Sequence, residues 1–115
     1  MEPITSTILL KAMDCLSSRM TAIAENIANS NTANYRPVHV NFEAALREAA
    51  TLGIGAVDSV QPEFQRESSG GIGSGGRIDM ELAASAVTRE RYGALAELLG
   101  REMLIASLAT TGGHG

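Results

Sequence analysis

Large apolar side chains recur along the first quarter of the 115-residue chain at alternating spacings of four and three residues. They are Leu9, Met13, Leu16, Met20, Ile23 and Ile27. This spacing places them on one side of an α-helix as a heptad seam of nearly three repeats. We therefore predict a helix over residues 3–31, with Pro3 at its first position and the seam packed against other helices.

A polar run is expected to end this helix. Asparagine, serine and threonine occupy five of residues 29–34. Such side chains hydrogen-bond nearby backbone groups in competition with helical bonds, so the run predicts a turn. Pro37 then holds Arg36 in an extended conformation. The alternation of Val38-His39-Val40 predicts a short strand.

A short second helix is predicted from Asn41 to about Leu52. Asn41 is a favourable N-cap, Glu43 can pair with Arg47 one turn later, and Gly53 can end the helix. The residues expected to share its buried face are Phe42, Leu46 and Ala49.

The following segment, residues 53–77, is rich in glycine and poor in large apolar residues. The cost of ordering its backbone exceeds what it can bury, which predicts a loop that orders against a partner, with short strands near 57–60 and 63–66. Residues 71–76 (GIGSGG) match the pattern G-x-G-x-x-G. A dinucleotide site needs a strand before this pattern within a βαβ unit, so we predict a flexible linker.

Helix-forming residues continue through the last segment, which predicts a helix over residues 78–111. Asp79 is the expected N-cap, with Glu81 in the first turn. The apolar surface comes from Leu82, Val87, Tyr92, Leu95, Leu98, Leu99, Met103, Leu104, Ile105 and Leu108. The later members cover most of the circumference, which indicates a helix buried on most sides.

Helix length indicates an elongated molecule. The two terminal helices would be about 42 and 50 Å long, whereas a compact domain of this size has a radius of gyration of about 13 Å. We expect one mainly α unit over residues 1–115. Its terminal helices form an elongated coiled-coil-like pair, joined by residues 32–77 with their turn, short helix and glycine-rich, partly extended middle.

Composition excludes several function classes. Nine basic against thirteen acidic residues give a net charge of −4, which disfavours nucleic acid as a partner. A single cysteine rules out an internal disulfide or a cysteine metal cluster. The longest strongly apolar run, residues 103–106, is far too short to span a membrane. The first residues lack the pattern of a cleaved secretory signal.

Candidate chemistry is sparse. Cys15 and His39 invite a thiol-nucleophile interpretation, but Cys15 lies within a predicted long helix without a local partner. His39 and His114 do not have metal-ligand spacing. We therefore predict no enzyme, no catalytic residue, no metal site and no cofactor.

Residues 23–36, IAENIANSNTANYR, resemble the signature of flagellar basal-body rod proteins, I-A-x-N-I-A-N-x-N-T-P-G-Y. We call residues 23–36 the signature segment. Residues 38–43 resemble the stretch that follows it in proximal rod members, and residues 78–104 resemble their C-terminal helix. Ala33-Asn34 stands where the family has Pro-Gly, but asparagine tolerates the positive φ of such a turn.

This resemblance implies a structural role in the bacterial flagellum. Such proteins are exported by the flagellar type III apparatus without a cleaved signal and assemble helically into the periplasmic rod. The implied partners are copies of the chain, other rod proteins, and the inner-membrane ring and export gate at the rod base. The implied signature turn contains Asn26, Asn29, Asn31, Thr32 and Tyr35, which would bond neighbouring backbones. The seam residues and Leu95, Leu98, Leu99, Ile105 and Leu108 would pack the helices and subunits.

A second hypothesis stays open from the sequence. A small soluble adaptor or chaperone that dimerises through the heptad seam would share the same pattern and acidity. Such a protein would form a discrete stable dimer, whereas a rod subunit would be poorly folded alone and would polymerise.

Overall fold

The computed structural model describes residues 2–68 and 74–112. Half of the glycine motif at residues 71–76, predicted to be a linker, lies outside the described residues. The elements are α1 (Pro3–Ala28), β1 (Val38–Asn41), α2 (Glu43–Ala50), α3 (Ile54–Asp58), β2 (Glu63–Arg66) and α4 (Ser74–Gly112). The prediction of a mainly helical chain with long helices at both ends is confirmed.

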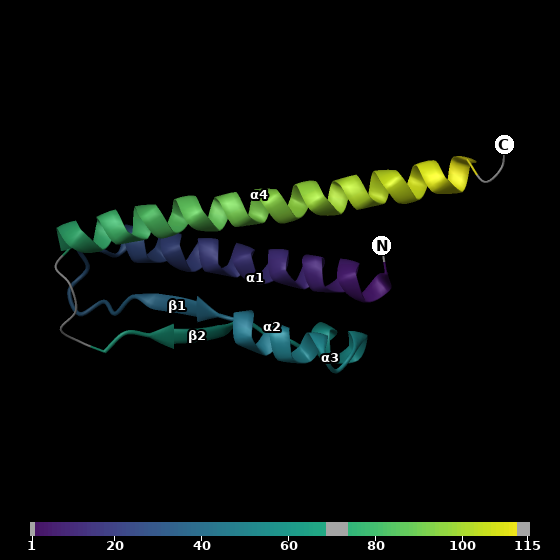
Figure 1. Cartoon of the computed structure of the whole chain (residues 1–115). Helices are drawn as coiled ribbons and strands as arrows, with labels where there is room; N and C mark the ends of the chain where they lie inside the picture. The colour runs from purple at the N-terminus through teal and green to yellow at the C-terminus, as the bar shows by residue number, and fades with distance from the viewer. Residues whose placement is uncertain (1, 69–73, 113–115) are drawn as a thin grey trace.

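These elements form three columns side by side, with α1 in the middle (Figure 1). The helix α4 runs antiparallel to α1 along one side, and the β1–β2 hairpin with α2 and α3 lies along the other. The molecule measures 65 × 26 × 14 Å with a radius of gyration of 18.0 Å. The predicted elongated shape is confirmed, because a compact chain of this size would have a radius near 13 Å.

Both long sides of α1 are covered as a result. The seam residues Leu9, Leu16 and Ile23 are buried, while Met13, Met20 and Ile27 are half-buried. A second face, which the sequence analysis missed, packs against the hairpin column. Its residues are Ile8, Ala12, Cys15, Arg19, Ala22 and Asn26. Small side chains on this face let the strand and the short helices approach α1 closely.

The short elements complete the hydrophobic core. Val38 and Val40 of β1, with the predicted face of α2 (Phe42, Leu46 and Ala49), are buried. The strands pair antiparallel with Val40 opposite Phe64, which confirms both a strand at Val38–Val40 and one at residues 63–66.

The middle of the chain differs from its prediction. Residues 54–58 form α3 where a strand was expected near 57–60. Val57 is fully buried, so this part is ordered by its own chain rather than by a partner. The reason is the second face of α1, whose small side chains supply the apolar surface that the segment lacks. The helix α2 ends at Ala50 with Thr51 as its C-cap, two residues before the predicted end, and Gly53, at φ 123°, is the N-cap of α3.

Two predicted helix caps are wrong. Asn41 belongs to β1 and its side chain donates to Gln65 Oε1 at 2.9 Å, so Phe42 occupies the N-cap of α2. Asp79 lies inside α4, which begins five residues earlier at Ser74. The additional turn contains Arg77, whose charge contacts described below stabilise it. Coiled-coil packing of α1 with α4 stays a prediction.

Candidate assembly interface

Asn26 joins three parts of the fold at one end of the molecule. Its side chain is fully buried. The amide Nδ2 donates to the Val38 carbonyl at 2.8 Å and to Glu81 Oε1 at 3.2 Å. The oxygen Oδ1 accepts from the Val38 N–H at 2.9 Å and from the Tyr35 hydroxyl at 2.8 Å. These bonds lie within the chain, so Asn26 fixes β1 and α4 on α1 rather than bonding a neighbouring subunit.

Arg19 fixes the same strand about two turns earlier on α1. Its Nε and Nη2 donate to the Val40 carbonyl at 3.1 and 2.6 Å, and its Nη1 and Nη2 bond both oxygens of Glu43 at 2.8 and 2.7 Å. The guanidinium also lies 4.9 Å from the centre of the Phe42 ring. Its hydrogen bonds hold the pKa of Glu43 at about 2, well below the usual value. The predicted Glu43–Arg47 pair is therefore replaced by Glu43–Arg19.

Together, Asn26 and Arg19 hydrogen-bond the edge of β1 that does not pair with β2. The Glu67 N–H donates to the Pro37 carbonyl at 2.8 Å, so in this antiparallel register the backbone N–H and C=O groups of alternate β1 residues point toward β2. The backbone groups of Val38 and Val40 point the other way, toward α1. Side chains of α1 bond them there, in the place that a third strand would take. Because an open strand edge invites pairing with other chains, this arrangement protects β1.

A charged cluster continues from Asn26 along the start of α4. Arg77 Nη2 lies 2.7 Å from Glu67 Oε2 and Arg77 Nη1 lies 3.8 Å from Glu81 Oε1. The Glu67 contact is ionic rather than a well-aligned hydrogen bond. His39 Nε2 lies 3.2 Å from Glu67 Oε1. Arg77 and Glu81 are buried, and no apolar pattern in the sequence could have identified them.

The polar turn after α1 is held by its own side chains. Asn29 Nδ2 donates to the Glu25 carbonyl at 2.9 Å, and Thr32 Oγ1 donates to Asn29 Oδ1 at 3.1 Å. Asn34 has φ 64°, the left-handed conformation expected where asparagine replaces glycine. Asn31 is exposed. The turn is therefore formed without a neighbour, and bonds from it to other subunits stay a prediction.

The helix α4 has a covered side and an exposed set of large apolar side chains. The covered side carries buried Arg77, Glu81 and Thr88, followed by half-buried Leu95 and Leu99. The exposed set contains Met80, Leu82, Val87, Tyr92, Leu98, Met103, Leu104, Ile105 and Leu108. A helix of a soluble monomer rarely exposes so many large apolar side chains, so this set indicates a surface for other chains.

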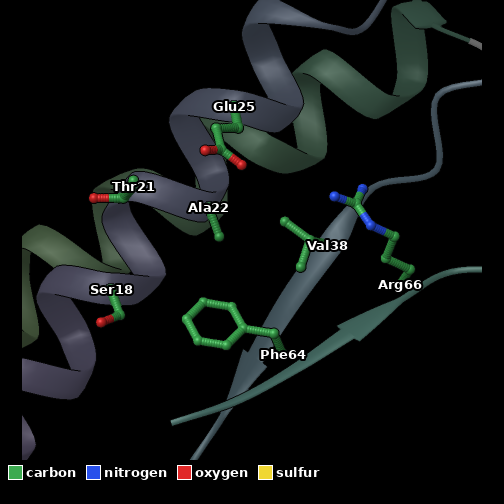
Figure 2. A pocket seen from close by; sticks show the side chains of 7 residues that line it. All are labelled: Ser18, Thr21, Ala22, Glu25, Val38, Phe64 and Arg66. Carbon is green, nitrogen blue, oxygen red and sulfur yellow. The ribbon is translucent and has the colours of Figure 1, made fainter.

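Two hollows lie on either side of the hairpin column. One, of about 400 Å³, is lined by α1 and the two strands, with Phe64 directed between them and Glu25 and Arg66 near its ends (Figure 2). The other, of about 350 Å³, is lined by α1, β1 and the start of α4. Cys15 lines neither hollow, and His39 lines the second.

Cys15 and His39 are not arranged for catalysis. The Cys15 thiol is fully buried, and burial, with the charge of Asp14 as a smaller cause, raises its pKa. A thiol of this kind is a poor nucleophile. The His39 side chain is half exposed on β1. Within residues 2–68 and 74–112, no group of three His, Cys, Asp or Glu side chains could hold a metal ion.

Comparison with known proteins found a match to one family model. Residues 8–36 match the family model described as flagella basal body rod protein. The chain thus carries the signature segment of a flagellar rod protein family. Flagellar rod proteins are structural rather than enzymatic, which agrees with the prediction of no enzyme. No curated protein matches the chain.

The match to the rod family covers most of α1 and the turn after it. Asn26, Tyr35 and Arg19 all lie within it, so the matched residues 8–36 include the side chains of α1 and the turn that hydrogen-bond β1 and α4. The family supports a location in the flagellar basal body and assembly with other rod components. No helix in the described part of the chain is long and apolar enough to cross a membrane.

Proposed function

We propose that the chain is a structural subunit of the proximal rod, of the FlgB type, which assembles helically through its terminal helices. The carrying observation is the exposed apolar set along α4, which continues to Leu108 at the far end of the molecule. Burying each such side chain against a neighbour contributes up to about 1.5–3 kcal/mol. Leu98, Ile105 and Leu108 are proposed to contact neighbouring subunits, as predicted.

The shape supports a role in transmitting torque. The molecule is 65 Å long and 14 Å thick, and its two long helices run along its greatest dimension. Close-packed side chains between parallel columns resist shear because interiors have low compressibility. Neighbouring subunits packed along their helices would pass a twisting force through such contacts, as a bacterial drive shaft for motility requires.

We also propose where the subunit lies and what it contacts. The subunit would lie in the periplasm, contact copies of itself and other rod proteins, and meet the inner-membrane ring and export gate at the rod base. Export by the flagellar type III apparatus fits a molecule whose core is a single layer. A small thin core gives marginal stability alone, so the chain can travel unfolded and fold on docking.

The adaptor or chaperone hypothesis has less support. It requires a heptad seam on α1 that is free for dimerisation. Leu9, Leu16 and Ile23 are instead buried within the chain. A seam-mediated dimer would have to separate α1 from its own neighbours.

The test is to delete the gene and locate a tagged copy that restores it. We expect the deletion strain to lose motility and its purified basal bodies to lack a rod, and the tagged chain to co-purify with basal bodies in fixed proportion to ring proteins. Normal motility of the deletion strain, or a tagged chain confined to the cytoplasmic fraction, would contradict the rod role. The second result would favour a chaperone.

A further inference from the structure

We propose a head-to-tail contact between copies of the chain, in which residues 104–111 of one α4 lie in the groove between α1, β1 and the start of α4 of the next copy. The inference rests on the proposed assembly of the chain and names the surfaces that meet.

The first surface is the end of α4 that residues 2–68 leave uncovered. Asn26 of α1 bonds Glu81 of α4, and this antiparallel register places Pro3, the first residue of α1, beside about residue 104. Figure 1 shows α4 continuing past the N-terminal end of α1. Leu104, Ile105 and Leu108 are 60, 53 and 62% exposed there.

The chemistry of this end restricts what it can contact. Residues 104–111 contain no Asp, Glu, Lys, Arg or His. A segment without charge and with three large aliphatic side chains fits an apolar groove. The C-terminal end of a helix carries partial negative charge from its free carbonyls, so a groove with basic residues at its rim suits it best.

The second surface combines apolar and basic lining residues. The hollow of about 350 Å³ is lined by apolar side chains of α1, β1 and α4, among them Ile23, Val40 and Ala84. Its charged lining consists of Arg19, His39, Arg77 and Glu81, three basic side chains against one acidic. Met80 also lines the hollow and is 54% exposed, so the apolar lining continues onto the surface of α4.

The positions of the two surfaces make the contact repeatable. The groove lies near the start of α4 and the uncovered segment lies at its end, so they occupy opposite ends of the 65 Å molecule. Two different surfaces that meet head to tail generate an open series of copies, whereas a self-complementary surface stops at a dimer. An open series is the form that a rod needs.

Disulfide trapping tests the contact in the full chain with Cys15→Ala. One variant carries Ala84→Cys in the groove and Leu108→Cys in the uncovered segment. These positions lie about 36 Å apart on one helix, so a disulfide between them must join two copies. The matched control pairs Leu108→Cys with Ala86→Cys, which is exposed two residues along but does not line the groove.

Under mild oxidation we expect the variant with Ala84→Cys and Leu108→Cys to form a ladder of dimers, trimers and longer species. The amount of cross-linked product should be at least tenfold greater than in the Ala86→Cys control. An equal mixture of the two single variants, Ala84→Cys and Leu108→Cys, should stop at the dimer. Circular dichroism checks that each variant folds. If the Ala84→Cys or the Ala86→Cys variant does not fold, Met80→Cys and its control Leu82→Cys replace them, since these residues are 54 and 52% exposed.

The outcomes separate this inference from the proposed function. Sedimentation of the Cys15→Ala chain reports whether copies assemble at all. Assembly without a ladder, or with equal ladders from both pairs, overturns the groove contact and leaves the rod role in place. A chain that stays monomeric at every concentration overturns the contact, while the deletion strain tests the rod role separately.

Discussion

The side chain of Asn26 and the backbone of Val38 form a two-way hydrogen-bonded pair, with Nδ2 donating to the carbonyl at 2.8 Å and Oδ1 accepting from the N–H at 2.9 Å. The carboxamide thus pairs with β1 as a neighbouring peptide group would. Because Asn26 also contacts Glu81 and Tyr35, the strand, the last helix and the turn depend on one buried side chain.

Replacing Asn26 by alanine should destabilise the fold strongly. The buried N–H and carbonyl of Val38 would lose their partners, and each such loss costs about 1–3 kcal/mol. We expect the free energy of unfolding in urea to fall by about 3 kcal/mol or more. Asn31→Ala, at an exposed position of the same segment, should change it by less than about 0.5 kcal/mol. Equal effects would contradict the role of Asn26.

Glu43 should make stability depend on pH. Arg19 lowers its pKa from 4.5 to about 2, so the contribution is fully present above pH 4.5 and is lost as the pH falls through about 2. The carboxylate side chain is 43% exposed, so solvent screening limits this contribution to about 1 kcal/mol. Urea midpoints between pH 2 and 6 should vary less in Glu43→Gln than in the parent, whereas Glu48→Gln, exposed on the same helix, should follow the parent.

The thiol of Cys15 should resist alkylation in the folded chain. Burial raises its pKa and excludes the reagent, so reaction requires local opening. We expect iodoacetamide at pH 8 to react about a hundredfold slower than in guanidinium, where the thiol is free. Ala24→Cys in a Cys15→Ala chain places a thiol at an exposed position of α1 and should react rapidly in both conditions. Fast labelling of native Cys15 would refute its place in the core.

Val57 should show that the middle of the chain belongs to the core. It is fully buried, so Val57→Ala should cost about 2 kcal/mol of unfolding free energy. Ile54→Ala removes a larger side chain from an exposed position of the same short helix and should cost much less. The reverse order in urea denaturation would indicate that α3 does not pack on α1.

Folding and assembly should separate in two aspartate variants. Ile23→Asp places a carboxylate in the buried seam and should abolish the cooperative unfolding transition, so assembly is lost with the fold. Leu108→Asp adds the same charge at an exposed position and should keep the helical circular dichroism signal. It should nevertheless fail to restore motility to a deletion strain. Motility with Leu108→Asp would contradict the use of this surface in assembly.

The long helices could be predicted because their signals are local and repeated. The spacing from Leu9 to Ile27 identified the first helix and its seam, and Asn34 was correctly placed in a left-handed turn. The second face of α1 was missed because its residues are small or polar. Cys15 and Ala22 are buried, and Ala12 is partly buried, by the elements that pack on them, and hydropathy along one helix does not report that.

The polar contacts could not be predicted for a related reason. Glu43 lies four residues before Arg47 on α2, yet it bonds Arg19 from another element. Arg77 and Glu81 appear as ordinary helix-surface charges until Glu67 and Asn26 are placed against them. Partners of this kind depend on which columns meet, which follows from the tertiary fold rather than from spacing.

Within residues 2–68 and 74–112, one side-chain hydrogen bond joins α1 to α4, from Asn26 to Glu81. The two helices are therefore hydrogen-bonded at one end and held by aliphatic contact at the other. Opening of the pair is therefore expected to begin at the N-terminal turns of α1, which within the described residues have no side-chain hydrogen bond to α4. Amide hydrogens near Ile4 would therefore exchange with solvent long before those around Ile23.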